Sequence, residues 1–255
     1  MLWLHRVLFY NLMMQDTTSP VPGAWAAHLS WPEIEKRIQS GALAMLPVGA
    51  GAKEHGRHLP LNTDQLQVEW LAARLIEKAN VLVWPALTYG HYPAFTDYPG
   101  SCSLSAPTFE KLVEEILDCL FDAGVKQMLI LNTGISTIQP LMRVVLREKR
   151  ARLVNVYQGA RYLKAEEKIR QQAHGSHADE LETSVMLAIA PEKVNMSKTA
   201  PWVKKMQPGK LMRKDSAHPN YSPDGVYGDP ALATREKGEA LLAAMLADIL
   251  SILEN

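Results

Sequence analysis

The chain has 255 residues, of which 47% are hydrophobic and 21% charged, as is usual for a soluble globular protein. Lys and Arg number 27 and Asp and Glu also 27, so the net charge is zero and neither nucleic acid nor an anionic membrane is an expected partner. No apolar run approaches the roughly 20 residues of a membrane span. Two cysteines without a paired motif favour a reducing compartment, and we expect a cytoplasmic protein.

The N-terminal residues are predicted to precede the folded domain. Residues 1–14 are apolar, but Arg6 and Asn11 interrupt them, whereas a signal peptide has an unbroken apolar centre. A targeting segment remains the alternative. Residues 16–23 (DTTSPVPG) form a polar, Pro-rich break. We therefore expect an N-terminal extension over residues 1–23 and a single domain over residues 24–255.

Helices and strands are predicted to alternate in the first part of the domain. Expected helices cover 31–41, 64–79, 107–123 and 139–149, and expected strands cover 43–48, 81–87, 127–132 and 151–157. Further helices are expected at 165–172, 178–190 and 233–253, with an irregular Pro-containing stretch at 196–230. Alternation of this kind predicts an α/β fold with three layers, in which helices flank a mainly parallel sheet. Loops at the carboxyl ends of the strands would share one edge, where such proteins bind ligands.

One cluster of candidate metal ligands follows the predicted strand at 43–48. Residues 53–64 (KEHGRHLPLNTD) contain Glu54, His55, His58 and Asp64. Imidazole nitrogens and carboxylate oxygens are the ligands of zinc, manganese and iron. A metal site at the end of a strand is therefore one interpretation. The alternative is that Glu54 and His55 make surface hydrogen bonds and Asp64 caps the next helix.

A second cluster begins the helix predicted at 178–190. Residues 174–184 (HGSHADELETS) place His177 near the helix start and Glu182 in its second turn. A histidine beside carboxylates is typical of a general acid/base pair, because the carboxylate fixes the tautomer and raises the basicity of the ring. Alternatively, the acidic residues only favour the helix dipole and Ser176 is an N-cap. Neither a GxGxxG nucleotide loop nor a GxSxG nucleophile motif is present.

The two clusters together resemble the signatures of the creatininase family of metal-dependent amidohydrolases. Residues 46–50 (LPVGA) followed by 54–64 (EHGRHLPLNTD) are similar to its first signature, and residues 177–184 (HADELETS) to its second. Residues 98–101 (YPGS) and 225–230 (GVYGDP) match further stretches of the family, and the similarity extends over about residues 25 to 245.

The resemblance implies a fold, an assembly and a chemistry. The family has an α/β fold with helices on both sides of a mainly parallel sheet, and its members are commonly homo-oligomers, often hexamers. Its typical site holds two divalent metal ions bridged by an aspartate and a water, and the activated water attacks an amide carbon. By this resemblance His55 and Asp64 are expected metal ligands, joined by Glu54. His177 is the expected acid/base residue, and Glu182 is expected to support it or to join the metal.

Three departures from the family pattern modify this expectation. Lys53 stands where the family has a glutamate two residues before the metal-binding histidine. Residues 132–137 (NTGIST) replace an Asn-Gly-His-x-x-Asn motif, and Ala173-His174 replace the Trp-Asp of creatininase itself. One or two divalent ions (zinc, manganese or iron) are therefore expected per chain, with one favoured over two and with His58 or His174 as replacement ligands. The substrate is expected to differ from creatinine.

The sequence therefore predicts a hydrolase that cleaves a C–N bond in a small amide, cyclic amide or formamide with a metal-activated water. The alternative is a non-catalytic relative that keeps the fold and binds a small ligand in a degenerate metal pocket. Retention of the two clusters favours the enzyme, whereas the replaced Asn-Gly-His motif favours the relative.

Overall fold

The structure is a computed structural model that describes residues 22–254. A five-stranded parallel sheet forms the centre of the molecule. The strands lie in the order β1-β3-β2-β4-β5. Their bounds are Ala24–Trp25 for β1, Leu43–Val48 for β2, Val81–Val83 for β3, Met128–Asn132 for β4 and Ala151–Asn155 for β5. The last residues of β2, β4 and β5 are paired in register, so these three strands end level at one edge. The predicted mainly parallel sheet is confirmed.

The helices agree with the expected positions to within a few residues, with one exception. They are α2 (Trp31–Gln39), α3 (Thr63–Ile76), α4 (Ala106–Asp122), α5 (Ile138–Arg147), α6 (Ala160–Ile169), α7 (Glu180–Ile189) and α8 (Arg235–Leu253). The exception is α6, which begins five residues before the predicted start at residue 165. The strand predicted over 81–87 was wrong beyond Val83, because Pro85 has no N–H to donate to a neighbouring strand. The two-residue strand β1 was not predicted.

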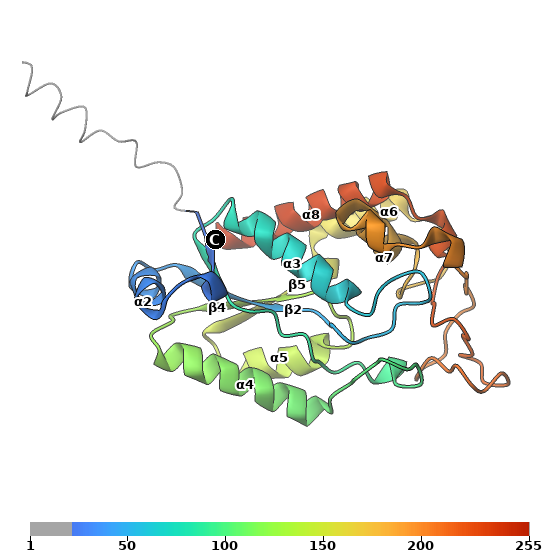
Figure 1. Cartoon of the computed structure of the whole chain (residues 1–255), viewed down its shortest axis with the longest axis horizontal. Helices are drawn as coiled ribbons and strands as arrows, with labels where there is room; N and C mark the ends of the chain where they lie inside the picture. The colour runs from blue at the N-terminus through green and yellow to red at the C-terminus, as the bar shows by residue number, and fades with distance from the viewer. Residues whose placement is uncertain (1–21, 255) are drawn as a thin grey trace, which may run out of the picture.

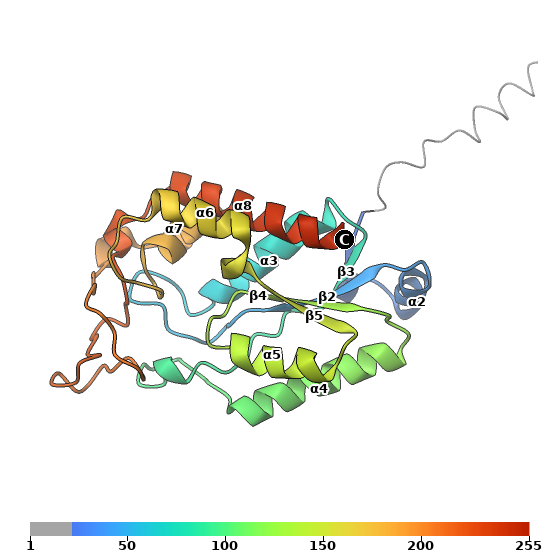
Figure 2. The ribbon, with the colours of Figure 1, turned by 180° about the vertical axis from the view of Figure 1, so that it is seen from behind.

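Helices cover both faces of the sheet, which confirms the three-layer architecture. Figures 1 and 2 show α4 and α5 on one face and α3, α6, α7 and α8 on the other. Alternate side chains of β4 enter the two separate cores: Leu129 and Leu131 pack towards α3 and α8, and Met128 and Ile130 pack towards α4 and α5. A strand buried on both sides needs an unbroken apolar sequence, which is what β4 has.

Short-range signals set the ends of the helices that carry or support the site. Helix α2 begins with a capping box between Ser30 and Glu33. Helix α7 begins after Asp179, whose carboxylate accepts hydrogen bonds from the backbone N–H groups of Leu181 and Glu182. Because this cap fixes the first turn of α7, it also fixes the direction in which Glu182 leaves the helix.

The irregular stretch predicted at 196–230 lies beyond the carboxyl ends of the strands (Figure 1). Isolated bridges tie it down: Tyr227 pairs with His177, and Trp202 pairs with Gly228. It therefore closes the edge at which α/β proteins bind ligands. Within residues 22–254 no helix has both the length and the apolar character that a membrane span requires. Of the N-terminal extension predicted over residues 1–23, residues 1–21 lie outside the described part of the chain.

Candidate metal centre

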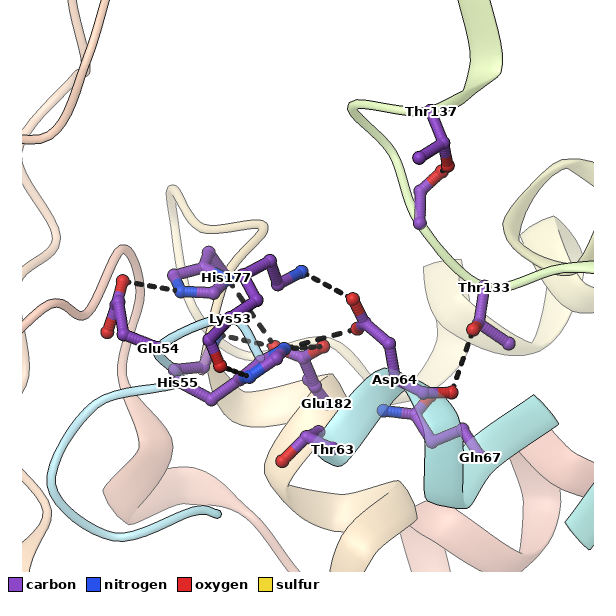
Figure 3. A network of polar contacts seen from close by, with 12 residues as sticks. Lys53, Glu54, His55, Thr63, Asp64, Gln67, Thr133, Thr137, His177 and Glu182 are labelled. Carbon is purple, nitrogen blue, oxygen red and sulfur yellow. Dashed lines mark hydrogen bonds and ion pairs between the residues drawn. The ribbon is translucent and has the colours of Figure 1, made fainter. Parts of the chain in front are cut away.

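His55 lies at the centre of a group of acceptor atoms at the carboxyl edge of the sheet (Figure 3). Its Nδ1 is 2.8 Å from the carbonyl oxygen of Lys53, which can only accept, so Nδ1 donates and Nε2 of the neutral ring carries a lone pair. That Nε2 faces Asp64 Oδ1 at 3.1 Å and Glu182 Oε1 at 3.6 Å. Acceptors facing one another in this way need either an added proton or a cation among them.

His177 reaches the same place from the other cluster. Its Nε2 lies 2.9 Å from Glu54 Oε1, and its Nδ1 lies 3.8 Å from Glu182 Oε2. Because the Glu54 carboxylate holds the Nε2 proton, the Nδ1 lone pair is left towards the site. The ring packs on Phe95 with 4.1 Å between centroids and lies 5.0 Å from the His55 ring. One ligand atom each of His55, His177 and Glu182 lies within 4.8 Å of the others.

Asp64 is held on its second oxygen by a buried lysine. The ammonium nitrogen of Lys53 is 2.7 Å from Asp64 Oδ2, and both side chains are almost fully buried. Burial on its own would raise the pKa of Asp64, but the adjacent Lys53 ammonium outweighs it and holds the pKa well below its usual range. Burial likewise opposes the charge on Lys53, yet Asp64, Glu182 and Glu54 together raise its pKa. The pair is therefore ionised on both sides.

The backbone conformation of Ala178 positions His177 and Glu182 relative to each other. Ala178 has φ +47°, a left-handed conformation that non-glycine residues seldom adopt outside functional sites. Its N–H donates to Glu182 Oε2 at 2.6 Å. The backbone N–H and C=O of His177 both pair with Tyr227, at 3.2 and 2.9 Å. This turn therefore brings His177 and Glu182 together although His177 lies before α7 and Glu182 lies within it.

Glu54 sits in a close-fitting backbone cradle. Its N–H donates to Ser101 Oγ at 3.0 Å, and its Oε2 accepts from the N–H of Gly56 at 2.9 Å. Gly225, at φ +73°, lies so close that a Cβ there would overlap the Glu54 carboxylate. The stretches at 98–101 and 225–230 that resembled the family thus act by holding Glu54 and, through Tyr227, His177.

A cavity of about 310 Å³ adjoins this cluster. The site contributes Lys53, Asp64, His177 and Glu182 to its wall, and the surrounding loops contribute aromatic and apolar side chains such as Phe95. The turn after β4 forms another part of the wall with Thr133, Ile135 and Ser136. A concave space with apolar walls and a few convergent charged groups is the usual form of a small-molecule site.

The turn after β4 is closed by its own hydrogen bonds. Asn132 Oδ1 accepts from the Gly134 N–H and from Thr137 Oγ1, and its Nδ2 donates to Asn155 Oδ1 at 2.9 Å. Thr133 Oγ1 donates to the backbone carbonyl of Asp64 at 2.9 Å. This turn therefore supports the start of α3 and offers no histidine or carboxylate to a metal.

The structure brings four of the predicted site residues together: ligand atoms of His55, His177 and Glu182 lie within 4.8 Å of one another, and Asp64 Oδ1 lies 3.1 Å from His55 Nε2. The fifth, Glu54, contacts His177 through its carboxylate and is not part of the group of converging ligand atoms found among the described residues, so its predicted role as a metal ligand stays a prediction. The sequence carried no signal for this contact, since the direction of Glu54 depends on Ser101 and Gly225, which are distant along the chain.

Neither predicted replacement ligand joins the group found among the described residues. His58 is buried, with Nε2 2.8 Å from Thr183 Oγ1. Burial, together with the nearby His55 and His177, lowers the pKa of His58 to about 4, so the ring is neutral near pH 7. His174 is exposed in the loop before His177. His58 therefore supports the loop, and His174 lies apart from the cluster.

Two contributions to the site were not predicted. Phe95 packs against His177 from a short 3-10 helix, Pro93–Phe95, and nothing in its sequence surroundings indicated this. Lys53 was noted only as a departure from the family pattern, and its ion pair with Asp64 was missed. A buried lysine between a strand and a cluster of acids was the available signal, because such an amine needs a carboxylate partner.

Comparison with known proteins places this geometry in a family. A family model described as "Creatininase: Creatinine amidohydrolase" matches residues 27–253. The creatinine amidohydrolase of Pseudomonas putida is 27% identical over 255 residues, covering 88% of this chain and 94% of the relative. A mycofactocin precursor peptide peptidase of Mycobacterium ulcerans (strain Agy99) is 28% identical over 267 residues, covering 96% and 92%.

A solved structure of a creatininase mutant, described as the Zn–Zn type, superposes with a TM-score of 0.76. It is 23% identical and covers 92% of this chain and 98% of its own, a likeness that establishes the fold. The family model in turn spans most of the sequence and includes every residue of the cluster. The chain therefore belongs to the creatininase family, whose members are hydrolytic enzymes.

Proposed function

We propose that the protein is a metal-dependent hydrolase that cleaves a C–N bond in a small amide, cyclic amide or formamide. The observation that carries this proposal is the convergence of His55 Nε2, Asp64 Oδ1 and Glu182 Oε1 beside a cavity of about 310 Å³. The names of two relatives, an amidohydrolase and a peptidase, describe hydrolysis of C–N bonds and support the same reaction type.

The donor set fits a divalent ion. His55 Nε2 faces one oxygen of Asp64 at 3.1 Å and one oxygen of Glu182 at 3.6 Å, and three protein ligands are enough for a catalytic site that keeps a position open for water. Zinc, manganese and iron all accept this set. A bound ion would supply a Lewis acid that polarises a carbonyl oxygen and makes a water molecule more acidic. We assign His55, Asp64 and Glu182 as its ligands.

His177 is the proposed proton carrier. Glu54 holds Nε2 at 2.9 Å, which orients the ring and leaves Nδ1 as its acceptor atom. His177 also lines the cavity, where its Nδ1 can accept the proton of the attacking water and return it to the leaving nitrogen. Glu54 acts through His177 and is therefore a positioning residue. This assignment replaces the expectation that Glu54 binds the metal.

The cavity favours a small substrate with an apolar part. Phe95, Tyr157 and Leu211 contribute to its walls, and its volume matches the lower end of small-molecule pockets. We expect a substrate other than creatinine, because Ala173-His174 occupy the place of the residues that cover creatinine in the family. The expected homo-oligomer remains a prediction.

A second candidate is a non-catalytic relative that binds a small ligand in the same cavity. The turn after β4 favours it, because Asn132 and Thr137 are hydrogen-bonded to the turn itself and to Asn155 and leave that side of the cavity without metal ligands. The two candidates share the fold and the cavity. They differ in whether a bound metal ion produces turnover.

Metal analysis of tag-free protein tests the proposal. We expect close to one equivalent of transition metal per chain and a lower melting temperature after chelation, because a bound ion stabilises the folded state. Less than about 0.2 equivalents, with no change in melting temperature on chelation, would contradict a metal centre. Release of amines, ammonia or formate from a panel of small amides, cyclic amides and formamides then separates the candidates. Bound metal without turnover supports the non-catalytic relative.

A further inference from the structure

Asp64 lies between two positions that attract cations. Its Oδ1 faces the lone pair of His55 Nε2 at 3.1 Å, and its Oδ2 contacts the ammonium of Lys53 at 2.7 Å. Figure 3 shows Lys53 and His55 approaching the carboxylate from different directions. A carboxylate that is 2% exposed requires its negative charge to be balanced by a nearby cation. The Lys53 ammonium balances it at Oδ2, and an ion bound to His55 Nε2 could balance it at Oδ1.

Lys53 is built into its position. The residue follows β2 in the same loop as His55, and its backbone N–H donates to Leu61 while its carbonyl fixes the tautomer of His55. The ammonium lies 5.1 Å from the centre of the Phe95 ring, which also packs on His177. Asp64 is its only ion-pair partner among the described residues, and the side chain lines the cavity. The ammonium therefore keeps donors available to a molecule bound there.

Among the described residues, the turn after β4, which lies near Lys53, offers no histidine or carboxylate to a second ion. Thr133, Ile135 and Ser136 line the cavity, and Asn132 is hydrogen-bonded within its own turn and to Asn155. Among residues 22–254, one group of at least three metal-ligating side chains is found, and it contains His55, His177 and Glu182. Within the described part of the chain, the cation that contacts Asp64 Oδ2 is thus the lysine itself.

We propose that the Lys53 ammonium takes the place of a second metal ion, so that the protein has a one-metal centre in which Asp64 bridges the ion and the lysine. This inference rests on the proposed metal-dependent function and adds the number of ions and the role of Lys53. The ammonium balances Asp64 permanently and leaves only the His55 side of the carboxylate for a metal. It also presents N–H donors to an oxygen of the substrate, a task that a second ion would otherwise perform.

Zinc titration of the metal-free full-length chain tests the inference. Bound Zn²⁺ is measured by equilibrium dialysis and elemental analysis at a fixed free concentration. We expect one equivalent for the unaltered protein and a second, weaker one for Lys53→Glu, because the change removes a cation and adds a carboxylate beside Asp64 Oδ2, and water can complete the coordination of an ion held by two carboxylates. Lys111→Glu is the charge-matched control: Lys111 lies exposed on α4, paired with Glu115, and should leave one equivalent.

A second variant keeps the inference testable if Lys53→Glu does not fold. Lys53→Met keeps an apolar side chain of similar length but leaves Asp64 without its ammonium. Its metal-free form should melt lower than the unaltered protein, and added Zn²⁺ should raise its melting temperature by more. An equal zinc-dependent rise in both proteins contradicts the inference, as does a Lys53→Glu protein that folds and still binds one equivalent.

The outcomes separate this inference from the proposed function. Two equivalents bound to the unaltered protein would overturn the role of Lys53 and leave the metal-dependent hydrolase intact. No bound zinc in the unaltered protein, with no effect on melting, would overturn the proposed metal centre and this inference with it.

Discussion

Two turns that follow neighbouring strands differ sharply in chemistry. The loop after β2 carries Lys53, Glu54 and His55, and Asp64 follows in the first turn of α3; all four are buried. The turn after β4 begins at the residue paired with the end of β2, yet its polar groups bond to one another and to the framework. Position at the carboxyl edge of a parallel sheet thus provides the opportunity for a site, and the side chains on each turn decide whether it is used.

The loop after β2 should respond to a single substitution with complete loss of the metal. His55→Ala removes the nitrogen around which the carboxylates of Asp64 and Glu182 converge. We expect bound metal and hydrolytic activity to fall below detection, measured by elemental analysis and by turnover. His28→Ala, which changes an exposed histidine in the short 3-10 helix Ala26–His28 outside the cluster, is the matched control and should change neither. Metal content that survives His55→Ala would disprove the ligand assignment.

His177 should separate proton transfer from metal binding. His177→Gln keeps a side chain that can bond to Glu54 but removes a basic nitrogen. We expect kcat to fall by about 10²- to 10⁴-fold, the usual contribution of a general acid/base residue, with metal content close to that of the unaltered protein. If the metal is lost as well, His177 is a ligand, as its position within 4.8 Å of His55 and Glu182 would allow.

The loop after β2 should also make the fold sensitive to acid through His58. The pKa of this buried ring is lowered to about 4 from an ordinary 6.5, so the unfolded chain takes up a proton before the folded one does. The contribution of His58 to the free energy of unfolding is therefore fully present above pH 6.5. It is lost as the pH falls towards 4, and the loss is at most about 3 kcal/mol. The turn after β4 contains no titratable side chain and lacks this response.

Comparison with His58→Gln isolates this effect from other titrating groups. The difference in free energy of unfolding between the unaltered and variant proteins, from urea denaturation at pH 7.5, 6.5, 5.5 and 4.5, should shrink as the pH falls. Asp179, whose burial raises its pKa to about 6, changes stability in the opposite direction but does so equally in both proteins. A difference that stays constant across this range would refute the assignment.

The turn after β4 should show the smallest effect and one of a different kind. Thr137→Ala removes the hydroxyl that donates to Asn132 Oδ1 and to the carbonyl of Gly134. We expect a loss of about 1 kcal/mol in the free energy of unfolding, from chemical denaturation, because the turn loses the hydroxyl donor while Asn132 Oδ1 keeps the Gly134 N–H and the Gly134 carbonyl keeps Asn132 Nδ2. Zinc stoichiometry should not change. A fall in metal content would mean that the two turns are less independent than their hydrogen bonds indicate.

Much of the fold followed from local patterns. The apolar run of β2 was predicted at both ends, and the capping residues Ser30 and Gly41 marked the limits of α2. The start of α6 was missed because Gly159 begins it without a side-chain cap. The two-residue β1 was missed because a pairing that short leaves no periodicity to detect.

The candidate site was predictable in membership but not in pairing. Histidines and carboxylates at the carboxyl ends of strands indicated which residues would gather, because topology brings those ends together. Which carboxylate meets which histidine depends on contacts between distant segments. Glu54 is turned towards His177 by Ser101 and Gly225, and Lys53 is drawn to Asp64 because a buried ammonium needs an anion.

The ion pair of Lys53 with Asp64 has a consequence for the order in which the chain folds. Both residues belong to the β2–α3 segment, so their contact closes only a short loop, whereas the contact of Glu54 with His177 spans 123 residues. Short loops close at lower entropic cost and usually earlier. The nascent segment can thus bury Asp64 with its charge already balanced, before the second half of the chain exists to complete the centre.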